Sequence, residues 1–91
     1  MSKDFDYCGI VFIGGGSSWA YADSPEKAAE KAAKFCKSDW KSLFKFKRKQ
    51  EFSVCVYDMK AHEGWYATGG GVYDQDTKEE IPLLEVISVT V

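Results

Sequence analysis

The sequence predicts an α+β fold in which one amphipathic helix packs on a mostly antiparallel, five-stranded sheet. Only residues 23–44 show helical periodicity, and short runs rich in β-branched and aromatic residues stand on both sides of them. Glycine and polar turn residues separate these runs, which is typical of strands joined by tight turns. The expected order is β-β-α-β-β-β. A chain of 91 residues is the size of a single domain, spanning residues 1–91.

The first two strands are expected to form a hairpin around the glycine triplet Gly14–Gly16. Tyr7–Ile13 reads YCGIVFI and is apolar on both faces, which favours a central strand buried on both sides. A second short run follows at Trp19–Ala22. A phosphate-binding loop needs a Lys after its glycines and a helix that begins at the loop. Because neither follows Gly14–Gly16, the triplet indicates a hairpin turn.

The segment DSPEKAAEKAAKFCKSDWKSLF predicts a helix of about four to five turns. Ser24 is a good N-cap and Pro25 falls at the first helical position, while Ser38–Asp39 is a candidate interruption. The alanine-rich first half lets the helix backbone lie close to the sheet. Lysines at 27, 31, 34, 41 and 45 form a stripe on one side. The opposite half holds the apolar residues Ala28, Ala29, Ala32, Ala33, Phe35, Cys36, Trp40, Leu43 and Phe44.

Three further strands are expected after the helix. Glu51–Met59 alternates, with Phe52, Val54 and Val56 on one face and Cys55 and Tyr57 on the other. Trp65–Tyr73 is expected as one strand that bends or bulges at Gly69–Gly71. Leu83–Val91 is the last strand, which either pairs beside the first strand or forms an edge of the sheet.

The residues capable of catalysis or metal binding do not form a convincing site. Cys8, Cys36 and Cys55 are odd in number and far apart, so they are not a disulfide framework, and at least Cys36 is expected to be a buried thiol. A zinc site of these cysteines and His62 would need each ligand from a separate element. A Cys55–His62 nucleophile pair is disfavoured because Cys55 stands between two valines in a strand. We therefore expect no enzymatic activity, no metal and no cofactor.

The distribution of apolar and charged residues along the chain indicates the cellular compartment and the kind of partner. No apolar run approaches the roughly 20 residues of a membrane-spanning helix, and the first residues lack signal-peptide features. We expect a cytoplasmic protein that does not bind membranes. The net charge of −2 is uneven: residues 1–25 carry −2, residues 26–51 carry +5 and residues 52–91 carry −5. Such asymmetry can mark a surface for a partner.

These observations predict a small, soluble, non-enzymatic module that binds another protein or a second copy of itself. An aromatic sheet face, left open by the single helix, and a basic segment at the helix end are the expected binding surfaces. The alternative is RNA or single-stranded DNA bound by Trp40–Phe52, where basic residues and rings alternate. The residues expected to bind a partner are Trp19, Tyr21, Tyr57, Trp65 and Tyr73 on the sheet, and Trp40, Lys41, Lys45, Lys47, Arg48 and Lys49 on the basic segment.

Overall fold

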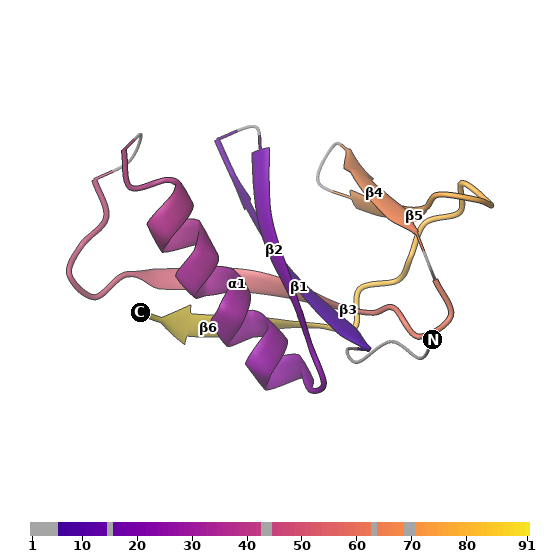
Figure 1. Ribbon diagram of the computed structural model, residues 1–91, viewed down its shortest axis with the longest axis horizontal. Helices are drawn as coiled ribbons and strands as arrows, with labels where there is room; N and C mark the ends of the chain where they lie inside the picture. The colour runs from indigo at the N-terminus through magenta and orange to yellow at the C-terminus, as the bar shows by residue number, and fades with distance from the viewer. Residues whose placement is uncertain (1–5, 15, 43–44, 63, 69–70) are drawn as a thin grey trace.

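One helix and six strands, arranged in two sheets, make up the part of the chain described by the computed structural model, residues 6–14, 16–42, 45–62, 64–68 and 71–91 (Figure 1). The larger sheet is antiparallel and has the strand order β2-β1-β3-β6, and β4 and β5 form a separate hairpin. The α+β class, the position of the helix after the first two strands and the antiparallel pairing are therefore confirmed, whereas four strands rather than three follow the helix. The elements are β1 (Tyr7–Ile13), β2 (Gly16–Ala22), α1 (Pro25–Asp39), β3 (Glu51–Asp58), β4 (Trp65–Thr68), β5 (Gly71–Asp74) and β6 (Glu85–Thr90).

The expected five-stranded sheet is in fact two sheets of four and two strands. The difference arises at Trp65–Tyr73, which was predicted as one bent strand. Thr68 pairs with Gly71, so this segment is an antiparallel hairpin of two short strands. Glycines weaken a strand interior because they lose the most conformational entropy on ordering, which favours a break in the strand. Gly69 and Gly70 lie outside the described residues.

The first hairpin forms as predicted. Ile13 pairs with Gly16 across the turn, and Gly14 has a φ of 53°. The turns that join two strands through a two-residue loop require a left-handed backbone conformation at this position, and glycine adopts that conformation without strain. Gly15 lies outside the described residues. β1 is an inner strand between β2 and β3, which explains why its sequence is apolar on both faces.

The helix begins as predicted and ends earlier. The Ser24 hydroxyl accepts a hydrogen bond from the Lys27 N–H at 3.3 Å, and Pro25 opens the helix. The last helical residue is Asp39 and Trp40 is the C-cap, so the candidate interruption at Ser38–Asp39 is the helix end. Leu43 and Phe44 lie outside the described residues.

One face of the helix is buried, but it is narrower than the predicted apolar half. The alanines and Cys36 are fully buried, as expected, namely Ala28, Ala29, Ala32, Ala33 and Cys36. Phe35 is 52% exposed, although it belongs to the apolar half of the helix. It lies at the margin of the apolar half, and a helix resting on a flat sheet buries only the central stripe of that half.

Side chains on the two faces of the sheet belong to two separate clusters. The helix-side cluster lies between α1 and the sheet and includes Val11, Ala29, Phe52, Val54 and Val56. The hairpin-side cluster contains Cys8, Ile10, Tyr57, Met59, Val72 and Ile81. Val72 comes from β5, and Ile81 follows the bridge between Tyr73 and Glu80. Segments beyond β3 therefore cover part of the sheet face that α1 leaves free, and Tyr57 is buried rather than exposed.

β6 is the edge of the larger sheet and does not pair with β1. Of the two positions that the sequence allowed for the last strand, the structure therefore has the edge. It pairs with β3 from Glu51–Thr90 to Val56–Glu85. The ladder continues at one end, where Gln50 and Val91 exchange both backbone hydrogen bonds. No helix of the described residues is long and apolar enough to cross a membrane.

Candidate binding pocket between the two sheets

Three of the aromatic residues predicted to bind a partner meet where β2 faces the β4–β5 hairpin. Trp19 and Tyr21 come from β2, and Trp65 begins β4. They line a pocket of about 420 Å³ together with Ser17, Gly64, Tyr66, Ala67 and Gln75. Ligand pockets in proteins have volumes of roughly 300–1,000 Å³. We call this site the aromatic pocket.

Strand periodicity and the hairpin explain why these three rings meet. Alternate residues of β2 face opposite sides, so Ser18 and Ala20 turn toward the helix whereas Trp19 and Tyr21 turn away from it. The hairpin contributes to the cluster on that same side of the sheet. The pocket is therefore built from two sheets and did not follow from either segment alone.

The rings hold one another by edge-to-face contacts. The Trp19 ring lies 5.5 Å from Tyr21 at an interplanar angle of 75°, and 5.4 Å from Trp65 at 79°. Aromatic pairs favour this geometry because the positive ring edge meets the negative ring face. The Trp65 indole N–H also donates a hydrogen bond to the Tyr21 hydroxyl. Trp65 and Tyr21 are therefore fixed, while Trp19 remains 48% exposed at the surface.

The aromatic pocket offers stacking and hydrogen bonding. Its described lining residues include no Asp, Glu, Lys, Arg, His or Cys, and the side chains with hydrogen-bonding atoms are Ser17, Trp19, Tyr21, Trp65, Tyr66 and Gln75. Burial raises the pKa of the Tyr21 hydroxyl, more than the Trp65 hydrogen bond lowers it, so this group is neutral at physiological pH. Such a lining suits binding of an apolar or aromatic group whose edge carries hydrogen-bonding atoms.

The other two predicted sheet aromatics are not among the lining residues of the pocket. Tyr57 belongs to the buried hairpin-side cluster. Tyr73 projects from the other face of the β4–β5 hairpin, where its ring stacks on Tyr66 at 5.5 Å and 21°. The Lys78 ammonium lies 5.6 Å from the centre of the Tyr66 ring. The five aromatic residues thus do not form one continuous surface.

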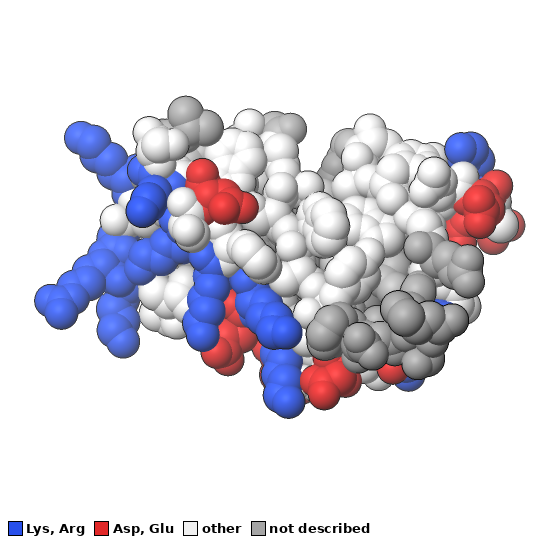
Figure 2. All heavy atoms as spheres, viewed as in Figure 1, with Lys and Arg blue, Asp and Glu red and all other residues white. Residues whose placement is uncertain are grey.

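The basic segment places its charges outside and its rings inside. Lys41, Lys45, Lys47, Arg48 and Lys49 are exposed, and Figure 2 shows Lys and Arg gathered at the end of the molecule where α1 ends. The Trp40 indole N–H donates to the Ser18 hydroxyl at 2.9 Å. Phe46 contacts Phe52 edge-to-face at 5.3 Å, and both pack on the helix-side cluster. Of the rings in this segment, those of Trp40, Phe46 and Phe52 contribute to folding rather than to an exposed stacking surface.

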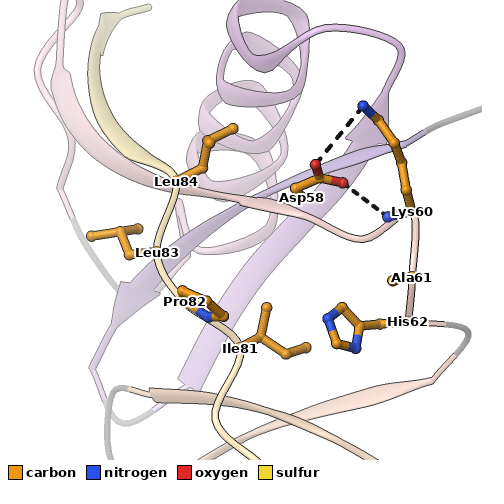
Figure 3. A pocket seen from close by; sticks show the side chains of 8 residues that line it. All are labelled: Asp58, Lys60, Ala61, His62, Ile81, Pro82, Leu83 and Leu84. Carbon is orange, nitrogen blue, oxygen red and sulfur yellow. Dashed lines mark hydrogen bonds and ion pairs between the residues drawn. The ribbon is translucent and has the colours of Figure 1, made fainter.

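A second pocket, of about 310 Å³, lies between the segment after β3 and the segment before β6 (Figure 3). His62, Lys60 and Asp58 line one side, and Ile81, Pro82, Leu83 and Leu84 line the other. None of the described lining residues is Ser, Thr or Cys. Lys60 contacts Asp58 and Tyr7, and these partners raise the pKa of its ammonium, the Tyr7 hydrogen bond most strongly. A lysine held in its charged form is a poor nucleophile.

His62 is paired with a buried carboxylate on β5. Its Nδ1 lies 2.5 Å from Oδ2 of Asp74, which is only 8% exposed. Oδ1 of Asp74 accepts the backbone N–H groups of Asp76 at 2.8 Å and Thr77 at 3.1 Å. These hydrogen bonds, that of His62 first, hold the pKa of Asp74 at about 2. The pair fastens the loop after β3 to the hairpin, which is a structural role.

The three cysteines are free thiols in different surroundings. Cys8 and Cys36 are fully buried and Cys55 is half-buried, so the expectation of a buried Cys36 thiol is confirmed. Burial raises the pKa of all three, that of Cys8 to about 12. Among the described residues, no three His, Cys, Asp or Glu side chains are placed to hold one metal ion.

Sequence reasoning missed Tyr66, Ser17 and Gln75 as lining residues of the aromatic pocket. The Trp-Tyr pair at 65 and 66 was the available signal, since it starts a short strand with rings on both faces. Ser17 and Gln75 carried no signal, because a turn-flanking serine and a loop glutamine are common on any surface.

Neither a protein-family model, nor a curated protein, nor a solved structure matches this chain.

Proposed function

We propose that this chain is a non-enzymatic module that binds another protein through the aromatic pocket. The observation that carries the proposal is the meeting of Trp19, Tyr21 and Trp65 from two separate sheets, with Trp19 about half exposed. Trp and Tyr supply large contact areas at low entropic cost and dominate the binding energy of many protein interfaces. The same proposal places the module in the cytoplasm.

The pocket geometry favours insertion of an apolar or aromatic side chain from the partner. Trp65 and Tyr21 are held by their hydrogen bond, so binding does not have to order them, and less conformational entropy is lost. The side chains of Ser17 and Gln75 lie at the same pocket and can receive hydrogen bonds from the partner backbone. Trp19 is then the anchor whose exposed ring becomes covered.

The experiment compares capture of proteins from a cell lysate by the immobilised chain and by two variants, with and without nuclease. Trp19→Ala removes the exposed ring of the pocket. Phe35→Ala is the matched control, because Phe35 is also about half exposed and aromatic but lies on α1. We expect nuclease-resistant partners that are lost at least tenfold with Trp19→Ala and kept with Phe35→Ala. Equal capture by the wild type and Trp19→Ala overturns the proposal.

The exposed basic residues favour a second candidate function, which is binding of RNA or single-stranded DNA through phosphates. Lys41, Lys45, Lys47, Arg48 and Lys49 supply the charge, whereas Trp40, Phe46 and Phe52 are turned to the core. Such binding would be electrostatic and would weaken steeply with salt. The test is titration of a fluorescent single-stranded RNA at low and moderate salt. Affinity that is independent of salt, or unchanged by a Lys47→Glu/Lys49→Glu variant, excludes this candidate.

A further inference from the structure

The outer edge of β6 has no strand partner among the described residues. β6 pairs with β3 on one side and ends the sheet order β2-β1-β3-β6. Figure 1 shows it along the margin of the larger sheet. An edge strand presents a row of backbone groups that can pair with another strand.

The hydrogen-bond pattern identifies which backbone groups point outward. Gln50 and Val91 exchange both hydrogen bonds, and bonded pairs alternate along an antiparallel ladder. Val89 and Ile87 therefore bond to β3, while Val86, Ser88 and Thr90 direct their N–H and C=O groups away from it. The side chains of these last three residues are exposed, and that of Val86 is 53% exposed.

The strand lacks the features that usually protect an edge. Natural edge strands are blunted by Lys, Pro or an inward-pointing charge, but residues 85–91 read EVISVTV, with one charge at the first position. β-branched residues make up most of the segment and favour extended backbone. β6 is therefore competent to accept a further strand along its whole length.

We propose that two copies of the chain associate by antiparallel pairing of their β6 strands, with Ser88 on the two-fold axis. A second copy is the partner that fits because β6 is complementary to itself in this register. Ser88 lies opposite Ser88, and Val86 lies opposite Thr90 of the other copy. All outward-pointing backbone groups then meet in hydrogen-bonded pairs. The register also pairs the full length from 85 to 91, and a two-fold axis closes the assembly at a dimer.

Apolar side chains support the same register. Ile87 and Val89 pack at the margin of the helix-side cluster, and in the dimer Ile87 of one copy lies opposite Val89 of the other. The two helix-side clusters thus become continuous across the axis, and the exposed flanks of Ile87 and Val89 leave water.

Charge is also complementary in this arrangement. Glu85 lies opposite Val91 of the other copy, on the face that carries Ile87 and Val89. The Lys37 ammonium donates to the Val91 carbonyl at 2.7 Å. The Glu85 carboxylate of one copy therefore approaches the Lys37 ammonium of the other, whereas the two Glu85 residues lie at opposite ends of the pairing.

The experiment measures molar mass by light scattering during size exclusion, over a range of concentrations. The wild-type chain is expected at twice 10.2 kDa. Ser88→Pro removes an outward N–H and leaves the β3 ladder intact, so it should be a folded monomer with an unchanged circular-dichroism spectrum. Ser88→Ala keeps the N–H and is the matched control, expected to remain a dimer. A monomeric wild type, or a dimeric Ser88→Pro, overturns the proposal.

A charge exchange tests the register without altering the backbone. Val86→Lys/Thr90→Lys places like charges opposite each other and should raise the dimer dissociation constant at least tenfold relative to Val86→Lys/Thr90→Glu, which places opposite charges there. Equal dissociation constants overturn the register. In the wild type, the amides of Val86, Ser88 and Thr90 should gain protection from hydrogen exchange as concentration rises. Trp19→Ala should leave the dimer intact, so the proposed dimer and the proposed function of the aromatic pocket are tested independently.

Discussion

Gly9 on β1 lies directly beneath the backbone of Ala28 on α1. A Cβ atom added at Gly9 would stand 2.6 Å from the Ala28 carbonyl oxygen and 2.9 Å from its carbonyl carbon. These atoms are helix backbone, so α1 as a whole would have to move to relieve the contact. The alanines of α1 and this glycine together set the distance between helix and sheet.

Gly9→Ala is accordingly expected to destabilise the protein by about 1–3 kcal/mol, the usual cost of overpacking. Urea denaturation followed by circular dichroism measures the change in free energy of unfolding. Ser53→Ala on the exposed face of β3 is the control and should change stability by less than about 0.5 kcal/mol. Equal stability of Gly9→Ala and the wild type would contradict the close approach of α1.

The hydrogen bond from Trp40 to Ser18 joins the helix end to β2. Ser18→Ala should destabilise the protein by about 1–2 kcal/mol, because the half-buried indole N–H loses its acceptor. Trp40→Phe removes the donor, so the double variant Ser18→Ala/Trp40→Phe should lose less than the sum of the two single changes. Strict additivity in urea denaturation would show that the two side chains are not coupled.

Asp74 makes stability depend on pH at the acidic end. Its pKa is lowered from 3.8 to about 2 in the folded state, so the unfolded chain takes up the proton first. The stabilisation is therefore complete above the unfolded pKa and is lost as pH falls from about 4 to 2. Asp74→Asn should be less stable at neutral pH and should lose less stability than the wild type over this interval. Parallel acid-denaturation curves for the two proteins would refute this assignment.

The cysteines should react in a definite order. Cys8 and Cys36 are fully buried, and burial raises the pKa of each thiol, so a thiol reagent should modify them only when the chain opens. Cys55 is half-buried and should react first, slowly because burial raises its pKa as well. Mass spectrometry after native labelling counts the modified sites. Rapid modification of all three under native conditions would be inconsistent with this packing.

Local sequence signals predicted the elements well, whereas contacts between distant segments escaped them. Ser24 and Pro25 marked the helix start, and alternation in β3 assigned Phe52, Val54 and Val56 to one face. Both signals depend on neighbours a few residues away. The burial of Tyr57 depends on Val72 and Ile81. Val72 comes from a hairpin that periodicity did not separate into two strands, and Ile81 follows the isolated bridge at Glu80.

At the candidate site, too, residue type could be predicted from the sequence, whereas the contacts between distant segments could not. Trp19, Tyr21 and Trp65 were selected from their residue type, and the structure brings them together. Tyr73 was selected by the same reasoning, yet its position on β5 turns it to the opposite face of the hairpin. One residue of register decides which face a strand side chain joins, and the register of β5 is set by its pairing with β4 rather than by its own sequence.

The aromatic pocket has one wall on each sheet, so its shape depends on the equilibrium by which the β4–β5 hairpin docks on the larger sheet. The hairpin meets the larger sheet through side chains, such as Trp65 on Tyr21 and Val72 in the hairpin-side cluster, while its backbone ladder is separate. A ligand that fills the pocket binds only the docked arrangement, and its observed affinity is the intrinsic affinity scaled by the docked fraction. Substitutions far from the pocket that favour docking will therefore tighten binding, and ligand will raise the melting temperature by mass action.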